Sequence, residues 1–456
     1  MRLKLFIFLL TFISFSVRAQ NEDSLFIRAL ADEILVNGQA YENLRVLTKQ
    51  VGHRLAGSPG MVKAEAWGAT ALKQAGAEKV WLQQCMVPHW VRGGKDEAHI
   101  VDAQKKNPRL DVLALGNSVG TGPKGVSAPV VLIHSFEELE QRKDEVKGKI
   151  VFYNYRFNEK LVRTFQAYSD AVRYRGQGPS RAAKYGAVGV IVRSMSHAAD
   201  NIPHTGSTNY NDSFPKIPAV AIGLRDADQL ADQVSKEKEV KVFFKTLAKQ
   251  LPDTIGHNVI GEIRGTEFPD EIITIGGHLD SWDVGEGAHD DGSGCVQSIE
   301  VLRALKAIGY KPKRTIRVVL FANEENGLRG GNKYAEEAKA KNEKHYFAVE
   351  SDAGGFTPRG FGFTMRPEQL EKVKKWAPLF LPYGVYELSM GGGGADIGPL
   401  QRTFGTPLAG LQPDSQRYFD IHHARSDVFE AVNKRELLLG ALNMAALVYL
   451  VDKYGL

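Results

Sequence analysis

Cysteine is scarce in this chain, and its scarcity excludes one class of protein. Only Cys85 and Cys295 occur among 456 residues, so a small scaffold held together by many disulfides is excluded. One bridge between the two is chemically possible in an oxidising compartment, but it requires a proximity that sequence does not reveal. Cys295 follows a Gly-Ser-Gly turn and fits a small buried residue more simply. Stability must therefore come from a hydrophobic core and, as argued below, from metal.

Long basic runs are also missing. The formal net charge is +5, and removal of residues 1–19 would take away three basic residues and no acidic one, leaving about +2. Nucleic-acid binders usually carry a basic patch or stripe. We therefore expect no nucleic-acid partner.

Long apolar runs are confined to the amino terminus. Arg2 and Lys4 form a short positive region before an almost wholly apolar stretch over residues 5–16, and Val-Arg-Ala follows at 17–19. The stretch is shorter than the ~20 residues that span a bilayer, and small residues suit a signal peptidase. We predict a signal peptide over residues 1–19, a secreted or periplasmic protein, and no membrane anchor after cleavage. No later stretch looks long and apolar enough to cross a membrane.

Hydrophobic spacing divides the rest of the chain into three parts. Residues 20–127 begin with helical spacing and continue into a strand-like stretch over 80–91. Residues 128–246 alternate short β-like runs with helical stretches between Gly and Pro turns. Residues 247–456 alternate buried strands and helices. We predict an α/β fold whose mixed sheet has helices on both faces, formed by the first and third parts, with the middle part inserted between them.

The middle part resembles a known module. Lys-Gly-Lys-Ile-Val at 147–151 and Ala-Lys-Tyr-Gly-Ala at 183–187 are similar to phrases of the protease-associated domain, a small β-rich fold with flanking helices. The resemblance implies a protease-associated domain over residues 128–246. It supplies no catalytic residue that we can identify.

Acidic residues and histidines gather where the predicted strands end. His278 and Asp280 close one strand, and Glu324 and Glu325 follow another. Asp352 follows a third. In open α/β sheets, binding sites form at the carboxyl ends of strands. Any one of these residues is explained more simply as a cap or turn residue, but so much acid in one place repels itself unless cations neutralise it.

Two further clusters add to this set, a turn with the pair Asp290 and Asp291 and a His422-His423 pair followed by Asp427. Mixed histidine and carboxylate ligands suit zinc, cobalt, manganese or iron rather than calcium or magnesium. The candidates exceed what one tetrahedral zinc needs, so they suit two ions bridged by one carboxylate. A His-Glu-x-x-His helix is absent, which disfavours a one-zinc endopeptidase of that type. Asp291 and Asp427 fit a supporting role as well as a ligand role.

These motifs together resemble a family. Gly-His-Leu-Asp-Ser at 277–281, Asp-Asp-Gly-Ser-Gly at 290–294, Phe-Ala-Asn-Glu-Glu-Asn-Gly-Leu-Arg-Gly at 321–330 and His-Ala-Arg-Ser-Asp at 423–427 occur in order. They are similar to the co-catalytic two-zinc exopeptidases, which include bacterial leucyl aminopeptidases and glutamate carboxypeptidase. Three more segments, at 350–354, 394–399 and 414–420, narrow the resemblance to one carboxypeptidase branch.

The resemblance implies a role for each matching residue. Asp290 matches the carboxylate that bridges both zincs, and its bond to Asp291 matches a cis peptide. His278 and Asp352 match the other ligands of one zinc, and Glu325 and His423 those of the second. Glu324 matches the general base. Asp280 stands two residues after His278, so in an extended chain it can orient that imidazole, and we class it with Glu324 as a catalytic residue. Relatives in this family are often homodimers.

One feature departs from the family pattern. Some relatives stabilise the oxyanion with a tyrosine just before the aspartate that matches Asp396, where this chain has Gly393 in a run of four glycines. Tyr418 and His422 are candidates for that role, and each fits a structural role at least as well. His53 is a candidate for the mouth of the site, although a plain turn role suits it better.

The sequence favours a zinc exopeptidase whose partner is a peptide substrate, either a dipeptidase or an aminopeptidase on longer peptides. A non-catalytic binding protein on the same fold is the rival from another class. Such relatives typically lose ligands or the base, whereas this chain has the full set.

Overall fold

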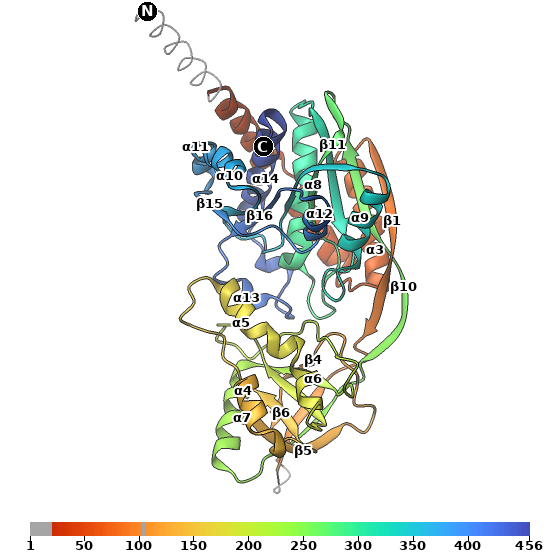
Figure 1. The fold of residues 1–456 in the computed structure, drawn as a ribbon, viewed down its shortest axis with the longest axis vertical. Helices are drawn as coiled ribbons and strands as arrows, with labels where there is room; N and C mark the ends of the chain where they lie inside the picture. Colours follow the sequence, from red (N-terminus) through yellow and green to blue (C-terminus); the bar gives the residue numbers. More distant parts are fainter. Residues whose placement is uncertain (1–20, 103–105) are drawn as a thin grey trace, which may run out of the picture.

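The computed structural model describes residues 21–102 and 106–456, so the predicted signal peptide of residues 1–19 lies outside the described residues. Figure 1 shows an elongated molecule with two parts stacked along its long axis. The amino- and carboxyl-terminal segments form one part, which we call the main part (residues 21–91 and 249–456). The middle of the chain forms the other, and each part has its own eight-stranded sheet.

The sheet of the main part is mixed, as predicted. Its strand order is β1-β10-β12-β11-β13-β16-β14-β15. The central strands β12, β11, β13 and β16 run parallel to one another, whereas β1 with β10, β10 with β12, and β14 with β16 pair antiparallel. The bounds are β1 Lys79–Val91, β10 Lys249–Ile263, β11 Phe268–His278, β12 Arg314–Phe321, β13 Lys344–Glu350, β14 Pro358–Thr364, β15 Glu387–Met390 and β16 Leu408–Pro413.

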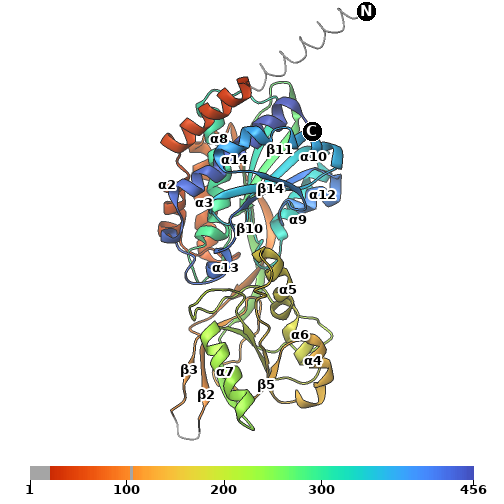
Figure 2. The ribbon, with the colours of Figure 1, turned by 90° about the vertical axis from the view of Figure 1, so that its left-hand side faces the viewer.

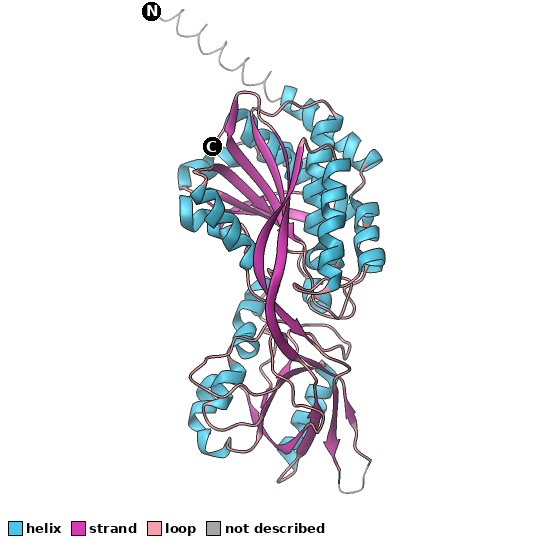
Figure 3. Ribbon diagram, turned by 90° about the vertical axis from the view of Figure 1, so that its right-hand side faces the viewer, coloured by secondary structure: helices cyan, strands magenta, loops and turns pink. Residues whose placement is uncertain are grey.

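Helices cover both faces of this sheet, which confirms the second half of the prediction (Figure 3). One face carries the larger core, packed against the segments α2 Ala40–Val46, α3 Pro59–Gln74, α8 Ser293–Ala307 and α14 Lys434–Tyr454. The other face packs a smaller core against α9 Arg329–Ala340 and α12 Gly398–Phe404. The short helices α10 Pro367–Lys374, α11 Ala377–Phe380 and α13 Tyr418–Ile421 lie in the connections.

The expectation about later apolar stretches was wrong. By length and composition, helix α14 is long and apolar enough to cross a membrane. The position of α14 in the fold explains its apolar composition. The helix packs against α8, β14 and β16 and is buried along most of its length. A helix that is apolar all round is typical of a buried core helix.

The second sheet has the order β3-β2-β9-β5-β6-β7-β8-β4, with a parallel centre of β5, β6, β7 and β8. Its strands are β2 Glu97–Val101, β3 Arg109–Leu110, β4 Val112–Ala114, β5 Val126–Ile133, β6 Ile150–Tyr153, β7 Gly189–Arg193, β8 Ala219–Ile222 and β9 Lys241–Lys245. Helices α4 Phe136–Gln141, α5 Thr164–Gly176, α6 Gly178–Ala183 and α7 Leu224–Lys236 flank it (Figure 2). We call residues 97–245 the insertion.

The insertion starts earlier than the sequence predicted. We placed residues up to 127 in the main part, but β2, β3 and β4 pair with β9 and β8 of the second sheet. The boundary therefore lies near Glu97 instead of residue 128. Short strands such as Arg109–Leu110 bury too few residues to show a period.

Two long strands join the parts. β1 and β10 pair along almost their whole length, from Lys79 with Glu262 to Val91 with Lys249. Figure 3 shows this twisted ribbon running out of the main sheet toward the insertion.

Both cysteines are free and buried, so the possible disulfide does not form, and Cys295 is the small buried residue that its turn suggested.

Candidate metal centre

The parallel strands of the main sheet bring the predicted residues together. β11 ends at His278, which lies in register with Phe321 at the end of β12. On its other side, β11 pairs Gly276 with Glu350 at the end of β13. The carboxyl ends of three strands thus meet at one edge, where the segments carrying Glu325 and Asp352 begin.

Asp290 lies at the centre of the cluster and divides it in two. Its Oδ1 lies 3.3 Å from His278 Nε2, and its Oδ2 lies 3.1 Å from His423 Nε2. His278 Nε2 is also 3.4 Å from Asp352 Oδ1, and His423 Nε2 is 3.0 Å from Glu325 Oε2. All five predicted ligands therefore lie in one cluster, with one oxygen of Asp290 facing each half.

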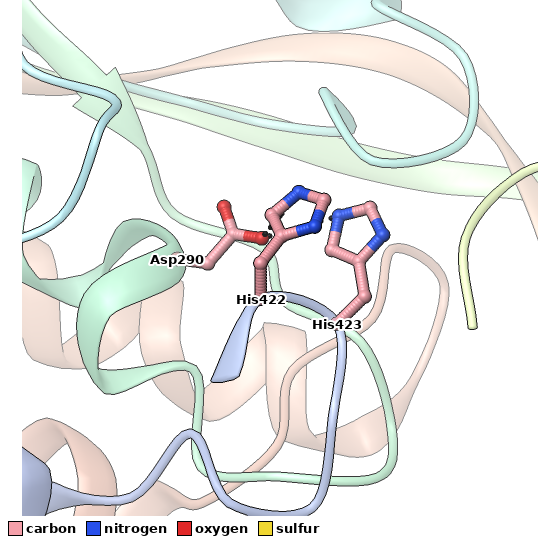
Figure 4. Close-up of side chains that lie close together, drawn as sticks. All are labelled: Asp290, His422 and His423. Atoms are coloured by element: carbon pink, nitrogen blue, oxygen red, sulfur yellow. Dashed lines mark ion pairs between the residues drawn. The ribbon is translucent and has the colours of Figure 1, made fainter. Parts of the chain in front are cut away.

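His422 joins the cluster as well. Figure 4 shows the rings of His422 and His423 beside Asp290. The two rings stack with centroids 3.5 Å apart, and His422 Nε2 lies 3.6 Å from Asp290 Oδ2. Within the described residues, Asp290 could hold an ion with His422 and His423, or with His278 and Asp352. The sequence placed the His422-His423 pair among the metal-capable residues, but the five-ligand assignment included only His423 and left His422 as an oxyanion candidate.

The donor set fits zinc. Among residues 21–102 and 106–456, Asp290 Oδ2 and Glu325 Oε1 are buried without a hydrogen-bond partner. Burial raises the pKa of Glu325 to about 7, and the Asp290 carboxylate adds to the effect. Buried acid without partners is costly, and a cation would supply the missing interaction. Imidazole nitrogens and carboxylate oxygens are ligands that zinc accepts.

The neighbouring carboxylates raise the pKa values of His278 and His423. Burial lowers the pKa of His278, but the Asp352 and Asp290 carboxylates outweigh it and raise that pKa well above its usual value. Burial also opposes protonation of His423, whose pKa Glu325 and Asp290 nevertheless raise to about 10. The carboxylates around these two imidazoles thus favour positive charge at this place.

Asp280 contacts residues of the cluster through both its backbone and its side chain. Its carbonyl oxygen lies 3.0 Å from His278 Nδ1, which leaves Nε2 free to face the cluster. Its carboxylate accepts the backbone amides of Glu324 at 3.0 Å and Glu325 at 3.3 Å. Asp280 therefore positions His278 and also the turn that carries Glu324 and Glu325.

Asp291 and Asp427 support the cluster in the same way. Asp291 accepts the amides of His278 and Gly294, each at 3.0 Å. Asp427 accepts the amides of His289 at 2.8 Å and Asp290 at 3.1 Å. Their carboxylates are thus engaged by the backbone and belong to neither metal-capable group. The peptide bond between Asp290 and Asp291 is cis, as the resemblance implied.

Glu324 is placed beside the ligands without being one of them. It is half-buried, next to Glu325 in the turn after β12, and belongs to neither metal-capable group. Burial raises its pKa well above the usual value, and the Asp352 and Glu325 carboxylates add to the shift. This position, close to the cluster and open on one side, suits an acid-base group.

Arg54 is a supporting residue that the sequence reasoning missed. Its side chain is fully buried and donates to the carbonyls of Leu279, Glu286 at 2.7 Å and Gly287 at 2.8 Å. It therefore holds the segment between His278 and Asp290. The sequence drew attention to the adjacent His53 instead, but His53 is exposed.

The oxyanion candidates lie in different surroundings. Tyr418 is buried, and its ring centroid lies 5.1 Å from that of His422. Gly393 packs on Leu408, and the adjacent Gly394 leaves no room for a side chain, since a Cβ would lie 2.0 Å from the Glu350 carboxyl carbon. The glycine run thus lets backbone approach Glu350 closely.

Known proteins are similar to this chain over most of its length. Residues 258–448 match the model of peptidase family M28. The chain is 37% identical to mouse carboxypeptidase Q over 413 residues, which is 91% of this chain and 85% of that protein. The crystal structure of a peptidase M28 precursor from Shewanella amazonensis SB2B matches with a TM-score of 0.89 and 32% identity over 95% of this chain and 97% of that one. A zinc aminopeptidase from Bacillus subtilis shares the fold, with a TM-score of 0.65 and 21% identity over 91% and 95% of the two chains.

Proposed function

Because the chain belongs to peptidase family M28 and is a zinc exopeptidase, we propose that it hydrolyses unblocked dipeptides and other short peptides with two zinc ions per chain. The observation that carries the proposal is the position of Asp290. Its two oxygens face different histidines, His278 at 3.3 Å and His423 at 3.1 Å, as a carboxylate shared by two cations requires.

Each half of the cluster would hold one zinc. His278, Asp290 and Asp352 form the first position, and Asp290, Glu325 and His423 form the second. When bound, zinc supplies Lewis acidity that polarises the scissile carbonyl and lowers the pKa of water. Each metal position would have three protein ligands, which leaves a coordination site open for water or substrate. This arrangement is typical of catalytic zinc.

Glu324 moves the proton in this mechanism. Its carboxylate accepts a proton from the attacking water and delivers it to the nitrogen of the leaving amine, the usual work of a general base. Asp280 keeps the base in place, because it accepts the Glu324 amide at 3.0 Å. His422 and Tyr418 remain our candidates for contact with the developing oxyanion.

Restriction to short substrates is supported by the insertion, which we propose to be a protease-associated domain. It packs against the segment before His422. Phe165 of α5 stacks on Tyr418 with ring centroids 5.4 Å apart, and Thr164 donates to the Ser415 carbonyl at 2.9 Å. A wall on this side of the cluster would hinder a long chain from lying across both metal positions. The similarity to carboxypeptidase Q supports cleavage at a chain end.

The test compares one dipeptide with its N-acetylated form, its C-amidated form, a tripeptide and denatured casein. Loss of rate on blocking either end would support a dipeptidase. Equal rates on the dipeptide and its amide would indicate an aminopeptidase instead. Rapid internal cleavage of casein would contradict the exopeptidase assignment altogether.

We also propose that the enzyme is exported, on the support of the signal-like residues 1–19. Amino-terminal sequencing of the mature protein should then begin at Gln20. A homodimer stays a proposal that sedimentation velocity would test.

A further inference from the structure

Resting on the two-zinc site proposed above, we infer that the insertion holds one metal position in place while the main part alone holds the other. The dependent position is the one at Glu325 and His423. The independent position is the one at His278 and Asp352. The insertion would then be a part of the metal centre and not only a wall beside it.

Thr205 of the insertion contacts His423 through two backbone groups. The Thr205 amide donates to the His423 carbonyl at 2.9 Å, and the Thr205 carbonyl lies 3.3 Å from His423 Nδ1. A histidine that binds metal through Nε2 carries its proton on Nδ1, and a carbonyl that accepts this proton fixes the ring. His423 also has a φ of 60°, which is uncommon outside glycine, so its backbone depends on such contacts.

Ser207 forms a hydrogen bond with Glu325, the second ligand of the same metal position. Its hydroxyl donates to the Glu325 carbonyl at 2.7 Å. One residue further along the ligand turn, the Asn326 side chain donates to Asn117 Oδ1 of the insertion at 3.1 Å. Segments 116–117 and 205–207 are themselves tied together, since the Gly116 amide donates to the Gly206 carbonyl at 2.9 Å.

Arg175 stiffens this support from within the insertion. Its buried guanidinium donates to the Thr205 carbonyl at 3.2 Å and to the Tyr168 hydroxyl at 2.6 Å. Gly206 leaves no room for a side chain, because a Cβ there would lie 2.3 Å from the guanidinium carbon of Arg175. The carbonyl that faces His423 is therefore held in a fixed place by packing and by hydrogen bonds.

Close packing adds to the polar contacts. Gly116 also has no space for a side chain, since a Cβ would lie 1.8 Å from the Trp282 ring. Trp282 in turn meets His423 edge to face, with ring centroids 5.7 Å apart. Residues of the insertion thus reach His423 both directly and through Trp282.

The other metal position shows no such support. His278 is held by the Asp280 carbonyl at Nδ1 and by Asp291 at its amide. Beside Asp352, the Ser351 hydroxyl donates to Gln297 at 2.7 Å. All these partners belong to the main part. Between residues 97–102 or 106–245 and either His278 or Asp352, no hydrogen bond is found.

The asymmetry predicts different zinc affinities in an altered insertion. Loss of a group that orients a metal ligand typically weakens metal binding 10–100-fold. We therefore expect Ser207→Ala to weaken one of the two zinc-binding steps about 10-fold and to leave the other unchanged. Ser207→Thr, which keeps the hydroxyl, should restore most of the lost affinity.

The experiment measures bound zinc over a series of buffered free-zinc concentrations, with metal counted by mass spectrometry. Ser180→Ala is the matched control, because Ser180 Oγ accepts the Asn211 amide at 2.8 Å inside the insertion. To assign the weakened step, Ser207→Ala is combined with Asp352→Ala and with Glu325→Ala. The weakening should persist in the first background and vanish in the second.

The inference would be overturned if Ser207→Ala left the zinc-binding curve unchanged or shifted both binding steps equally. It would also be overturned if Ser180→Ala produced the same shift. A weakening by Ser207→Ala that persists in the Glu325→Ala background and vanishes in the Asp352→Ala background would overturn it as well. If Ser207→Ala does not fold, Asn117→Ala removes the neighbouring bond to Asn326 and should shift the same step by less. A wild-type chain that binds no zinc would overturn the proposed two-zinc function together with this inference, whereas two zincs and an unshifted variant would overturn this inference alone.

Discussion

The two sheets of this protein have similar size and a parallel centre, yet their strand ends differ. In the main sheet, the ends of β11, β12 and β13 lead into buried acid whose oxygens include unpartnered ones, as at Asp290 and Glu325. In the insertion, β6 leads to Asn154 and β7 ends at Arg193, and these two bind each other at 3.1 Å. In the described residues of the insertion, the buried polar atoms without hydrogen-bond partners are nitrogens and a hydroxyl, as at His204 and Ser118, whereas carboxylate oxygens lack partners at the edge of the main sheet. Buried carboxylates without partners therefore distinguish the reactive edge.

Replacing the base should have the largest effect and should leave the metals alone. Glu324→Gln keeps the shape of the side chain and removes its ability to accept a proton. We expect kcat to fall at least ~100-fold, in the range for loss of a general base, with zinc content unchanged. Steady-state kinetics and metal analysis of the same preparation check both parts. Loss of zinc from this variant would show that Glu324 is a ligand.

Removing the neighbouring ligand should act through metal and stability. Glu325→Ala should keep about one zinc per chain and unfold at a lower temperature, because zinc that binds only the folded state stabilises it. At a free zinc concentration of 100 times the dissociation constant, that contribution is about 2.7 kcal/mol. Calorimetry with and without zinc measures it. Two retained zincs would contradict the role of Glu325.

A conservative change in the insertion core should have the smallest effect. Ile191 is fully buried in β7, and Ile191→Val should cost about 0.5–1.5 kcal/mol of folding free energy. Zinc content and kcat/KM should stay unchanged, since Ile191 packs in a core cluster formed by residues of the insertion. Chemical denaturation gives the cost. A change in zinc content would mean that the insertion core, and not only its loop contacts, controls the centre.

Much of the main part could be predicted because its pattern is strong. The apolar runs around 272–275 and 316–322 became β11 and β12, and the helical spacing over 295–308 became α8. The strand ends of a parallel sheet meet at one edge, so a gathering of acidic residues and histidines there could be expected, whereas the choice of the five ligands came from the family resemblance. Their pairing through Asp290 came from the family resemblance and not from spacing.

The supports of the centre could not be predicted, because they are contacts between segments far apart in sequence. Thr205 and Ser207 stand in an irregular segment without period, and the first bonds His423 while the second bonds Glu325. The sequence analysis singled out His53 and not Arg54, although folding buries Arg54 against three carbonyls. Helix α14 is long and apolar enough to cross a membrane by length and composition, and only the fold shows which elements cover its apolar surface.

The ribbon of β1 and β10 has a consequence for chain topology. Val91 and Lys249 are neighbours across the ribbon, so the chain leaves for the insertion and returns from it at almost the same point. A two-residue type I′ turn such as Asn-Gly could close these strands into a β-hairpin without rerouting any other connection. Such a shortened chain would keep every residue of the main sheet and both free cysteines. It would have no counterpart to the loop that orients His423, which makes it a natural starting point for rebuilding that half of the centre by design.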